Sequence, residues 1–249
     1  GSAQMVMIHD TARTPEPPRS VPALIDWIRA HPGRFAYPAP PDFTGSVFVR
    51  HLFYHAAGSV DAWLGNFDRQ AFATAADRTY ALLRELAPSL WRQGSTYPES
   101  PVRMAQLFAD GEIDLSFSYH QAEASKKIHD GLFPDTVRSY VFDEGTIANT
   151  HFVAIPFNAA DTAGAKVVAN FLLSPEAQLK KADPQVWGDF PAIDTMRLPE
   201  EWRKRFAALP RGIATLPDAV LQAHQLPEPP SEILIQLEKG WQQKVLKSR

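Results

Sequence analysis

Short apolar segments of strand length alternate with helical segments along most of this chain. The strand-like segments lie at residues 5–9, 35–37, 113–119, 137–142 and 152–156. Helical spacing predicts helices that begin at Ser20 and Ser100, and further helices over residues 46–56, 70–86, 121–129, 163–173, 174–181, 200–209 and 231–246. This alternation predicts an α/β fold, in which helices flank a mixed sheet and the C-terminal part is mostly helical.

The composition narrows the classes of partner. The chain has 249 residues, of which 45% are hydrophobic and 21% charged, as in a soluble globular protein. Its net charge is −3 and its Lys and Arg residues form no run, which argues against a nucleic-acid partner. Its apolar stretches are shorter than the ~20 residues of a membrane helix, so we expect no membrane insertion. It has no cysteine, which excludes disulfides, thiolate chemistry and zinc–sulfur sites.

The motifs of several enzyme classes are absent from the sequence. It contains no phosphate-binding loop, no dinucleotide-binding glycine turn and no nucleophile elbow. His51 and His55 stand four residues apart on a predicted helix, but no Glu follows His51, so the metalloprotease pattern fails. We therefore expect neither a metal nor a cofactor. Two alternatives stay open: an α/β enzyme whose catalytic group is assembled only by folding, and an interaction module such as a sensor or receptor lobe.

The segment from Tyr37 to Ser46 is the most informative for binding. It reads as a strand, a turn and a helix start, where free backbone amides attract an anion and the hydroxyls of Thr44 and Ser46 add donors. Gly45 would let a ligand approach the backbone, so that Gly45→Leu should block the ligand and leave the fold intact. The competing interpretation is that Thr44 or Ser46 only caps the helix.

Four further positions are candidates for a binding site. Ser118 and Tyr119 end a predicted strand, and ligands of open α/β sheets lie beyond such ends, although a solvent-exposed strand end explains them equally well. Asn149 lies in a polar loop over residues 144–150, which lines a cleft or forms an ordinary hairpin. Trp187 stands before Gly188 and could stack on a ligand, or pack in the core.

Taken in order, these segments resemble one family. The resemblance is carried by residues 5–9 with 17–20, 37–46, 111–119, 144–156 and 171–178. The chain is similar to the second lobe and C-terminal part of type II periplasmic solute-binding proteins of ABC importers, in their thiamine-type, YnjB-like branch. Members have two α/β lobes joined by crossover strands, and they trap a solute between the lobes.

The resemblance implies an organisation and a function. Residues 1–10 would be a crossover strand behind a tag remnant (Gly1-Ser2), residues 11–150 the second lobe, and residues 151–249 a return crossover and a helical region that packs against a first lobe. The match begins at the crossover strand, so we expect that first lobe to be missing. The implied function is capture of a small polar, thiamine-like solute in the periplasm for a membrane permease, without catalysis. Thr44, Gly45, Ser46, Ser118, Tyr119, Asn149 and Trp187 are the expected ligand residues.

Overall fold

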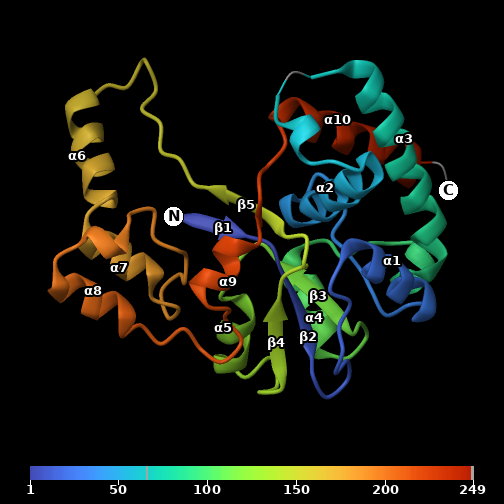
Figure 1. Ribbon diagram of the computed structural model, residues 1–249, viewed down its shortest axis with the longest axis horizontal. Helices are drawn as coiled ribbons and strands as arrows, with labels where there is room; N and C mark the ends of the chain where they lie inside the picture. The colour runs from blue at the N-terminus through green and yellow to red at the C-terminus, as the bar shows by residue number, and fades with distance from the viewer. Residues whose placement is uncertain (66, 248–249) are drawn as a thin grey trace.

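The computed structural model describes residues 1–65 and 67–247 (Figure 1). The strands are β1 (Ser2–Gln4), β2 (Val6–Asp10), β3 (Leu115–Ser118), β4 (Val137–Tyr140), β5 (Thr146–Thr150) and β6 (Gln225–Leu226). The α-helices are α1 (Val21–Ala30), α2 (Phe43–Ala57), α3 (Arg69–Leu86), α4 (Pro101–Ala109), α5 (Glu123–His129), α6 (Thr162–Leu172), α7 (Pro175–Ala182), α8 (Glu200–Ala207), α9 (Asp218–Ala223) and α10 (Ser231–Trp241). Short 3₁₀ or π turns follow or link several of them.

The strands form two small sheets that share one continuous segment of chain. In one sheet β2 lies between β3 and β4 and is antiparallel to both; in the other β5 lies between β1, antiparallel, and β6, parallel. Only Met5 separates β1 from β2, so the chain crosses from one sheet to the other at that residue. The predicted α/β fold with flanking helices is confirmed, although residues 35–37 form no strand and only Phe35 bridges to Leu115.

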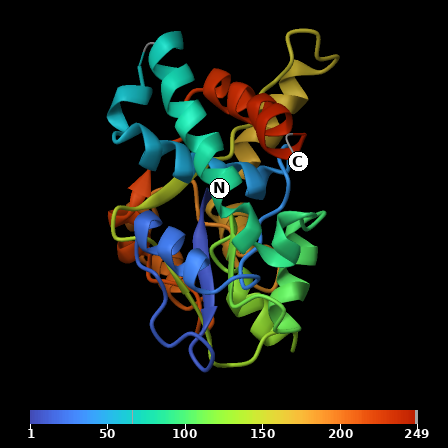
Figure 2. The ribbon, with the colours of Figure 1, turned by 90° about the vertical axis from the view of Figure 1, so that its right-hand side faces the viewer.

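One hydrophobic core joins the first 147 residues to the C-terminal helix. We call residues 5–147 and 231–246 the compact body. Helix α2 lies at its centre, buried from Thr44 to Tyr54. Helix α10 packs against α2 and α3, as the end view in Figure 2 shows, and buries Ile233, Leu237 and Trp241. The indole N–H of Trp241 donates to the Tyr37 hydroxyl over 3.1 Å. Helix α10 therefore packs with α2 and α3, within the range predicted as the second lobe.

Residues 151–224, which we call the outer segment, lie to one side of the compact body with α6 farthest out (Figure 1), while Ala214 and Leu221 near the end of the segment pack against the body. The prediction of a strand over residues 152–156 is wrong. The strand at this point is β5, which pairs with β1 in a register that ends at Ser2 opposite Thr150. Beyond Thr150 no strand of the described residues continues the ladder, and Phe152 is 90% exposed. Among the described residues, none of the helices has the length and apolar character needed to cross a membrane.

Candidate functional site

Side chains from three parts of the chain converge on the carboxylate of Glu228, which lies in the short segment between β6 and α10. The Tyr119 hydroxyl, just beyond β3, donates to Glu228 Oε1 over 2.6 Å. The Asn149 amide, on β5, donates to the same oxygen over 3.2 Å. The guanidinium of Arg50, on α2, donates through Nη1 to the other oxygen, Oε2. The site therefore joins both sheets to the central helix and to the segment between β6 and α10.

The cation of this cluster is almost completely buried. Arg50 is 1% exposed, and its Nε donates to the Ser46 carbonyl oxygen over 3.2 Å. Its guanidinium also lies over the ring of Phe43, 5.2 Å from the centroid. A buried charge is tolerated only when it is paired and hydrogen-bonded, which explains why a carboxylate stands beside it. Burial and then the Glu228 carboxylate raise the pKa of Tyr119 well above its usual range, so Tyr119 stays a neutral donor.

The start of helix α2 differs from both predictions. Asp42 is the N-cap, and its Oδ1 accepts from the amides of Thr44 (2.9 Å) and Gly45 (3.0 Å). These amides are therefore satisfied by a carboxylate of the chain, and neither Thr44 nor Ser46 caps the helix. The Ser46 hydroxyl donates instead to Glu238 Oε1 of α10 over 2.5 Å.

Gly45 is required by chain packing at this point. A Cβ atom at this position would lie 1.8 Å from the Pro38 carbonyl oxygen, a contact that only a backbone shift could relieve. The expectation that Gly45→Leu leaves the fold intact is therefore wrong.

The structure brings together most of the predicted site residues. Tyr119 and Asn149 share one acceptor, and Ser46 lies one helical turn before Arg50. The Ser118 hydroxyl accepts from the His120 amide over 3.0 Å, a contact that shapes the strand end.

Sequence reasoning missed Arg50 and Glu228. Arg50 was detectable as the single charge in an otherwise apolar helical run, whereas Glu228, in a proline-rich segment, carried no such signal.

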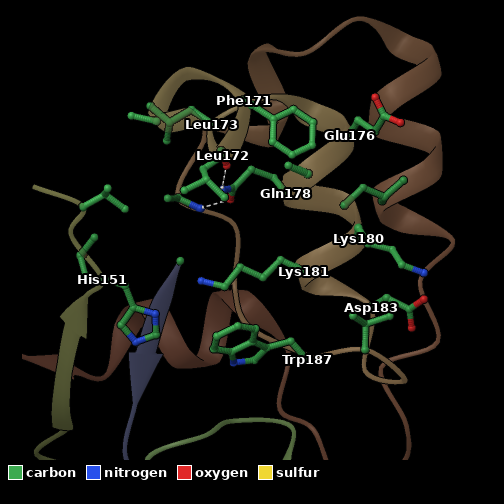
Figure 3. A pocket seen from close by; sticks show the side chains of 18 of the residues that line it. His151, Phe171, Leu172, Leu173, Glu176, Gln178, Lys180, Lys181, Asp183 and Trp187 are labelled. Carbon is green, nitrogen blue, oxygen red and sulfur yellow. Dashed lines mark hydrogen bonds between the residues drawn. The ribbon is translucent and has the colours of Figure 1, made fainter. Parts of the chain in front are cut away.

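Trp187 lies away from this cluster, in an apolar pocket of the outer segment (Figure 3). The pocket has a volume of 1080 Å³, and its lining includes Phe152, Phe171, Leu172 and Leu173. Lys181 Nζ lies 4.7 Å from the centroid of the Trp187 ring. One oxygen of the buried Asp189, next to the pocket, lies 2.7 Å from Lys181 Nζ and 3.1 Å from His151 Nδ1. Trp187 thus belongs to a second, separate surface.

His51 uses both of its ring nitrogens within the protein. Its Nδ1 lies 2.7 Å from the Val47 carbonyl oxygen, and its Nε2 accepts from the Ile147 amide over 3.1 Å. These partners fix the neutral tautomer that carries its proton on Nδ1. Desolvation by burial lowers the pKa of His51 to about 4. His51 therefore ties α2 to β5 and has no nitrogen left to bind a metal together with His55.

Comparison with known proteins identifies the family and the fold of this chain. Residues 2–210 match the family of bacterial extracellular solute-binding proteins. Protein YnjB of Escherichia coli (strain K12) is 42% identical over 224 residues, which cover 90% of this chain and 57% of that protein. The chain belongs to this family of solute-binding proteins, and it spans little more than half the length of that relative.

Solved structures agree with this assignment at the level of the fold. An ABC transporter from Clostridium perfringens ATCC 13124 has a TM-score of 0.67 at 17% identity, covering 98% of this chain and 67% of that one. A periplasmic thiamin binding protein has a TM-score of 0.62 at 17% identity, covering 98% of this chain and 64% of that one. The architecture described above is that of periplasmic solute-binding proteins.

Proposed function

We propose that this chain belongs to the solute-capturing component of an ABC importer, which acts in the periplasm and delivers a small polar solute to a membrane permease. The observation that carries the proposal is the convergence of Arg50, Tyr119 and Asn149 at the junction of the two sheets. Membership of the solute-binding family supports it. Thr44, Gly45, Ser46 and Ser118 frame this site as structural neighbours. Such a protein performs no covalent chemistry.

A thiamine-like solute is one finer form of this proposal, in which Glu228 stays in place beside the bound cation. The structural likeness to a periplasmic thiamin binding protein supports it. So does the aromatic pair of Phe43 and Tyr119, whose ring centroids are 4.9 Å apart, because a planar organic cation can stack on such rings. Phe43 is the first residue of α2 and is half exposed. The carboxylates of Glu228 and Glu238 contact Arg50 and Ser46 of the same helix.

We further propose that the outer segment packs against a first lobe in a longer protein. The exposed apolar side chains of Phe152, Phe171 and Trp187 support this, because a contiguous apolar surface of this kind marks an interaction site. The greater length of the curated relative supports it as well. In the longer protein, fluorescence of Trp187 should shift to the blue relative to this chain alone; an unchanged spectrum would contradict the packing.

The experiment that tests solute capture is a thermal-shift screen followed by calorimetry on the full-length protein, with thiamine among the solutes. Tyr119→Phe and Asn149→Ala should each weaken the binding of a hit. Tyr140→Phe is the matched control, because Tyr140 is also buried but lies on β4, away from the site. Equal affinity in all three variants would remove the Glu228 cluster from the binding site.

The alternative function, an α/β enzyme, is favoured by one contact. His151 Nδ1 lies 3.1 Å from Asp189 Oδ2, which is the histidine–carboxylate pair that acid–base chemistry uses. The same oxygen also pairs with Lys181, so the carboxylate is already engaged by a cation. Mass spectrometry of the solute recovered after prolonged incubation separates the two functions, because capture returns the solute unchanged and catalysis converts it.

A further inference from the structure

The acceptor at the centre of the candidate site belongs to the chain itself. Three donors from three parts of the chain meet on the carboxylate of Glu228: the Arg50 guanidinium, the Tyr119 hydroxyl and the Asn149 amide. A cation with two neutral donors around one carboxylate is the arrangement that proteins use to bind a free carboxylate ligand. We infer that Arg50, Tyr119 and Asn149 form a carboxylate-binding cradle, which Glu228 occupies until a carboxylate-bearing solute displaces it.

The cradle and its occupant differ in how firmly they are held. Arg50 is 1% exposed and sits in the middle of α2, the central helix of the compact body. The Glu228 side chain is 23% exposed and belongs to a segment that is neither helix nor strand. Of its two neighbours, Pro227 is exposed and Pro229 is buried, and the Pro227 carbonyl oxygen accepts from the Tyr54 hydroxyl over 2.9 Å. The donors are therefore fixed by the core, and the carboxylate enters from the edge.

Glu228 leaves two polar atoms of these residues without a hydrogen-bond partner among the described residues. Arg50 Nη2 is buried and has no hydrogen-bond partner among the described residues, because Glu228 engages only Nη1. Asn149 Oδ1 is likewise buried without a partner among them. A free carboxylate is not tied to a backbone, so it can take both nitrogens of the guanidinium in the bidentate geometry that arginine favours. A solute with a hydrogen-bond donor beside its carboxylate would also satisfy the Asn149 oxygen.

Exchange of one carboxylate for another makes displacement feasible. Removing Glu228 alone would leave the Arg50 cation buried and unpaired, which is costly. A solute carboxylate that enters as Glu228 leaves keeps Arg50 paired, and Glu228 regains water at the surface. Because Glu228 is tethered, it competes at a high effective concentration, so only solutes with further contacts displace it. Glu228 thus sets the selectivity of the site against simple carboxylates such as acetate.

Chemical rescue tests the cradle directly. Glu228→Ala should lower the melting temperature at neutral pH, and sodium acetate or formate should restore most of that loss in a saturable way. Sodium chloride at the same concentration should not. The double variant with Tyr119→Phe should need more acetate for the same effect. Wild-type protein should show no acetate-specific shift, because its cradle is filled.

Glu238→Ala is the matched control. Glu238 also accepts from α2, through the Ser46 hydroxyl, but the cradle donors do not surround it, so acetate should not rescue its loss. If Glu228→Ala does not fold in buffer, the yield of refolding in acetate against chloride gives the same readout. Equal effects of acetate and chloride, or equal acetate rescue of both variants, would overturn the inference.

The choice of ligand rests on the proposed solute-binding function, but the rescue experiment does not. Acetate rescue without any solute in the screen would support the cradle and leave solute capture unsupported. A solute that binds to the full-length protein, in the absence of acetate rescue, would do the reverse. Thiamine has no carboxylate, so a thiamine hit that Glu228→Gln weakens would also contradict displacement.

Discussion

Helices α1 and α6 have similar lengths and similar apolar stripes, but their surroundings are opposite. α1 belongs to the compact body and buries Val21, Leu24, Ile25 and Ile28. α6, which is described in full, buries none of its residues, and Val167, Val168, Phe171 and Leu172 of its stripe are exposed. The difference teaches that an amphipathic pattern is enough to specify a helix but not the surface that covers it. The proposal that the outer segment packs against a further lobe would supply a covering surface for α6.

The largest expected difference in stability is between substitutions of two leucines on the apolar stripes of α1 and α6. Leu24 of α1 is 1% exposed, whereas Leu172 of α6 is 40% exposed. Leu24→Ala should lower the free energy of unfolding by about 2–5 kcal/mol, because it removes buried methyl groups and leaves a cavity. Leu172→Ala should change it by no more than about 0.5 kcal/mol. Urea unfolding followed by circular dichroism measures both. Equal losses would mean that α6 is covered in solution.

A buried histidine of the compact body should make the stability of the protein depend on pH. The pKa of His51 is about 4 in the folded state, against an ordinary value of 6.5, so the unfolded chain takes up a proton first as the pH falls. Stability is therefore lost between about pH 6.5 and pH 4, by up to about 1.4 kcal/mol per pH unit and about 3 kcal/mol in all. Urea unfolding at pH 7, 6 and 5 measures the slope.

The control for this prediction is His51→Gln, which offers an amide oxygen to the Ile147 amide and does not titrate. The variant should be less stable than the wild type at pH 7 and should lose less stability on acidification. His9 is also buried and its pKa is also lowered by desolvation, so some slope should remain in the variant. Parallel curves for the two proteins would show that His51 is not the titrating group.

Two glycines at matching helix positions compare the packing around the compact body with the packing around the outer segment. Gly45 of α2 and Gly164 of α6 occupy the same place, and each donates its amide to the Asp that caps its helix. A Cβ at Gly45 would lie 1.8 Å from the backbone oxygen of Pro38, whereas at Gly164 it would meet Asp161 Oδ2 at 2.4 Å. The Asp161 side chain can rotate away, and the backbone of Pro38 cannot.

Gly45→Ala should therefore destabilise the protein by about 1–3 kcal/mol, as overpacking does. Gly164→Ala should change the stability by less than about 1 kcal/mol, because the better helix propensity of alanine offsets the adjustment of the cap. Thermal unfolding of the two variants measures the difference in their melting temperatures. A larger loss for Gly164→Ala than for Gly45→Ala would refute the contrast between the regions.

The sequence was sufficient for what depends on local signals. The stripe and the Ser20 cap predicted α1, and a similar stripe predicted α6 within one residue. Local reasoning failed where partners come from elsewhere in the chain. Arg50 and Glu228 are 178 residues apart, and no local pattern pairs them.

Two remaining errors of the sequence-based prediction have identifiable physical causes. Asp42 precedes Thr44 by two residues and takes the cap, because a carboxylate beside the first turn accepts from two amides at once. The extended segment after Thr150 has the apolar residues of a strand, but its ladder partner ends at Ser2. Tyr119 and Asn149 were identified from their place at strand ends and in a polar segment, and their role in binding a solute stays a prediction.

The smallest expected effect comes from two serine caps that are alike locally. Ser20 accepts from the Ala23 amide over 3.1 Å, Ser174 accepts from the Ala177 amide over 3.2 Å, and a proline stands in the first turn of each helix. Replacement of either serine by alanine should cost about 0.5–2 kcal/mol locally. For Ser20→Ala this loss should appear in the urea midpoint of the whole protein, because α1 is part of the shared core. For Ser174→Ala it should appear as faster amide exchange in α7, with the midpoint unchanged, because the outer segment buries few apolar side chains and can open by itself. Hydrogen exchange and urea unfolding on the same two variants separate these outcomes. If Ser174→Ala lowers the midpoint as much as Ser20→Ala does, the outer segment and the compact body unfold as one unit.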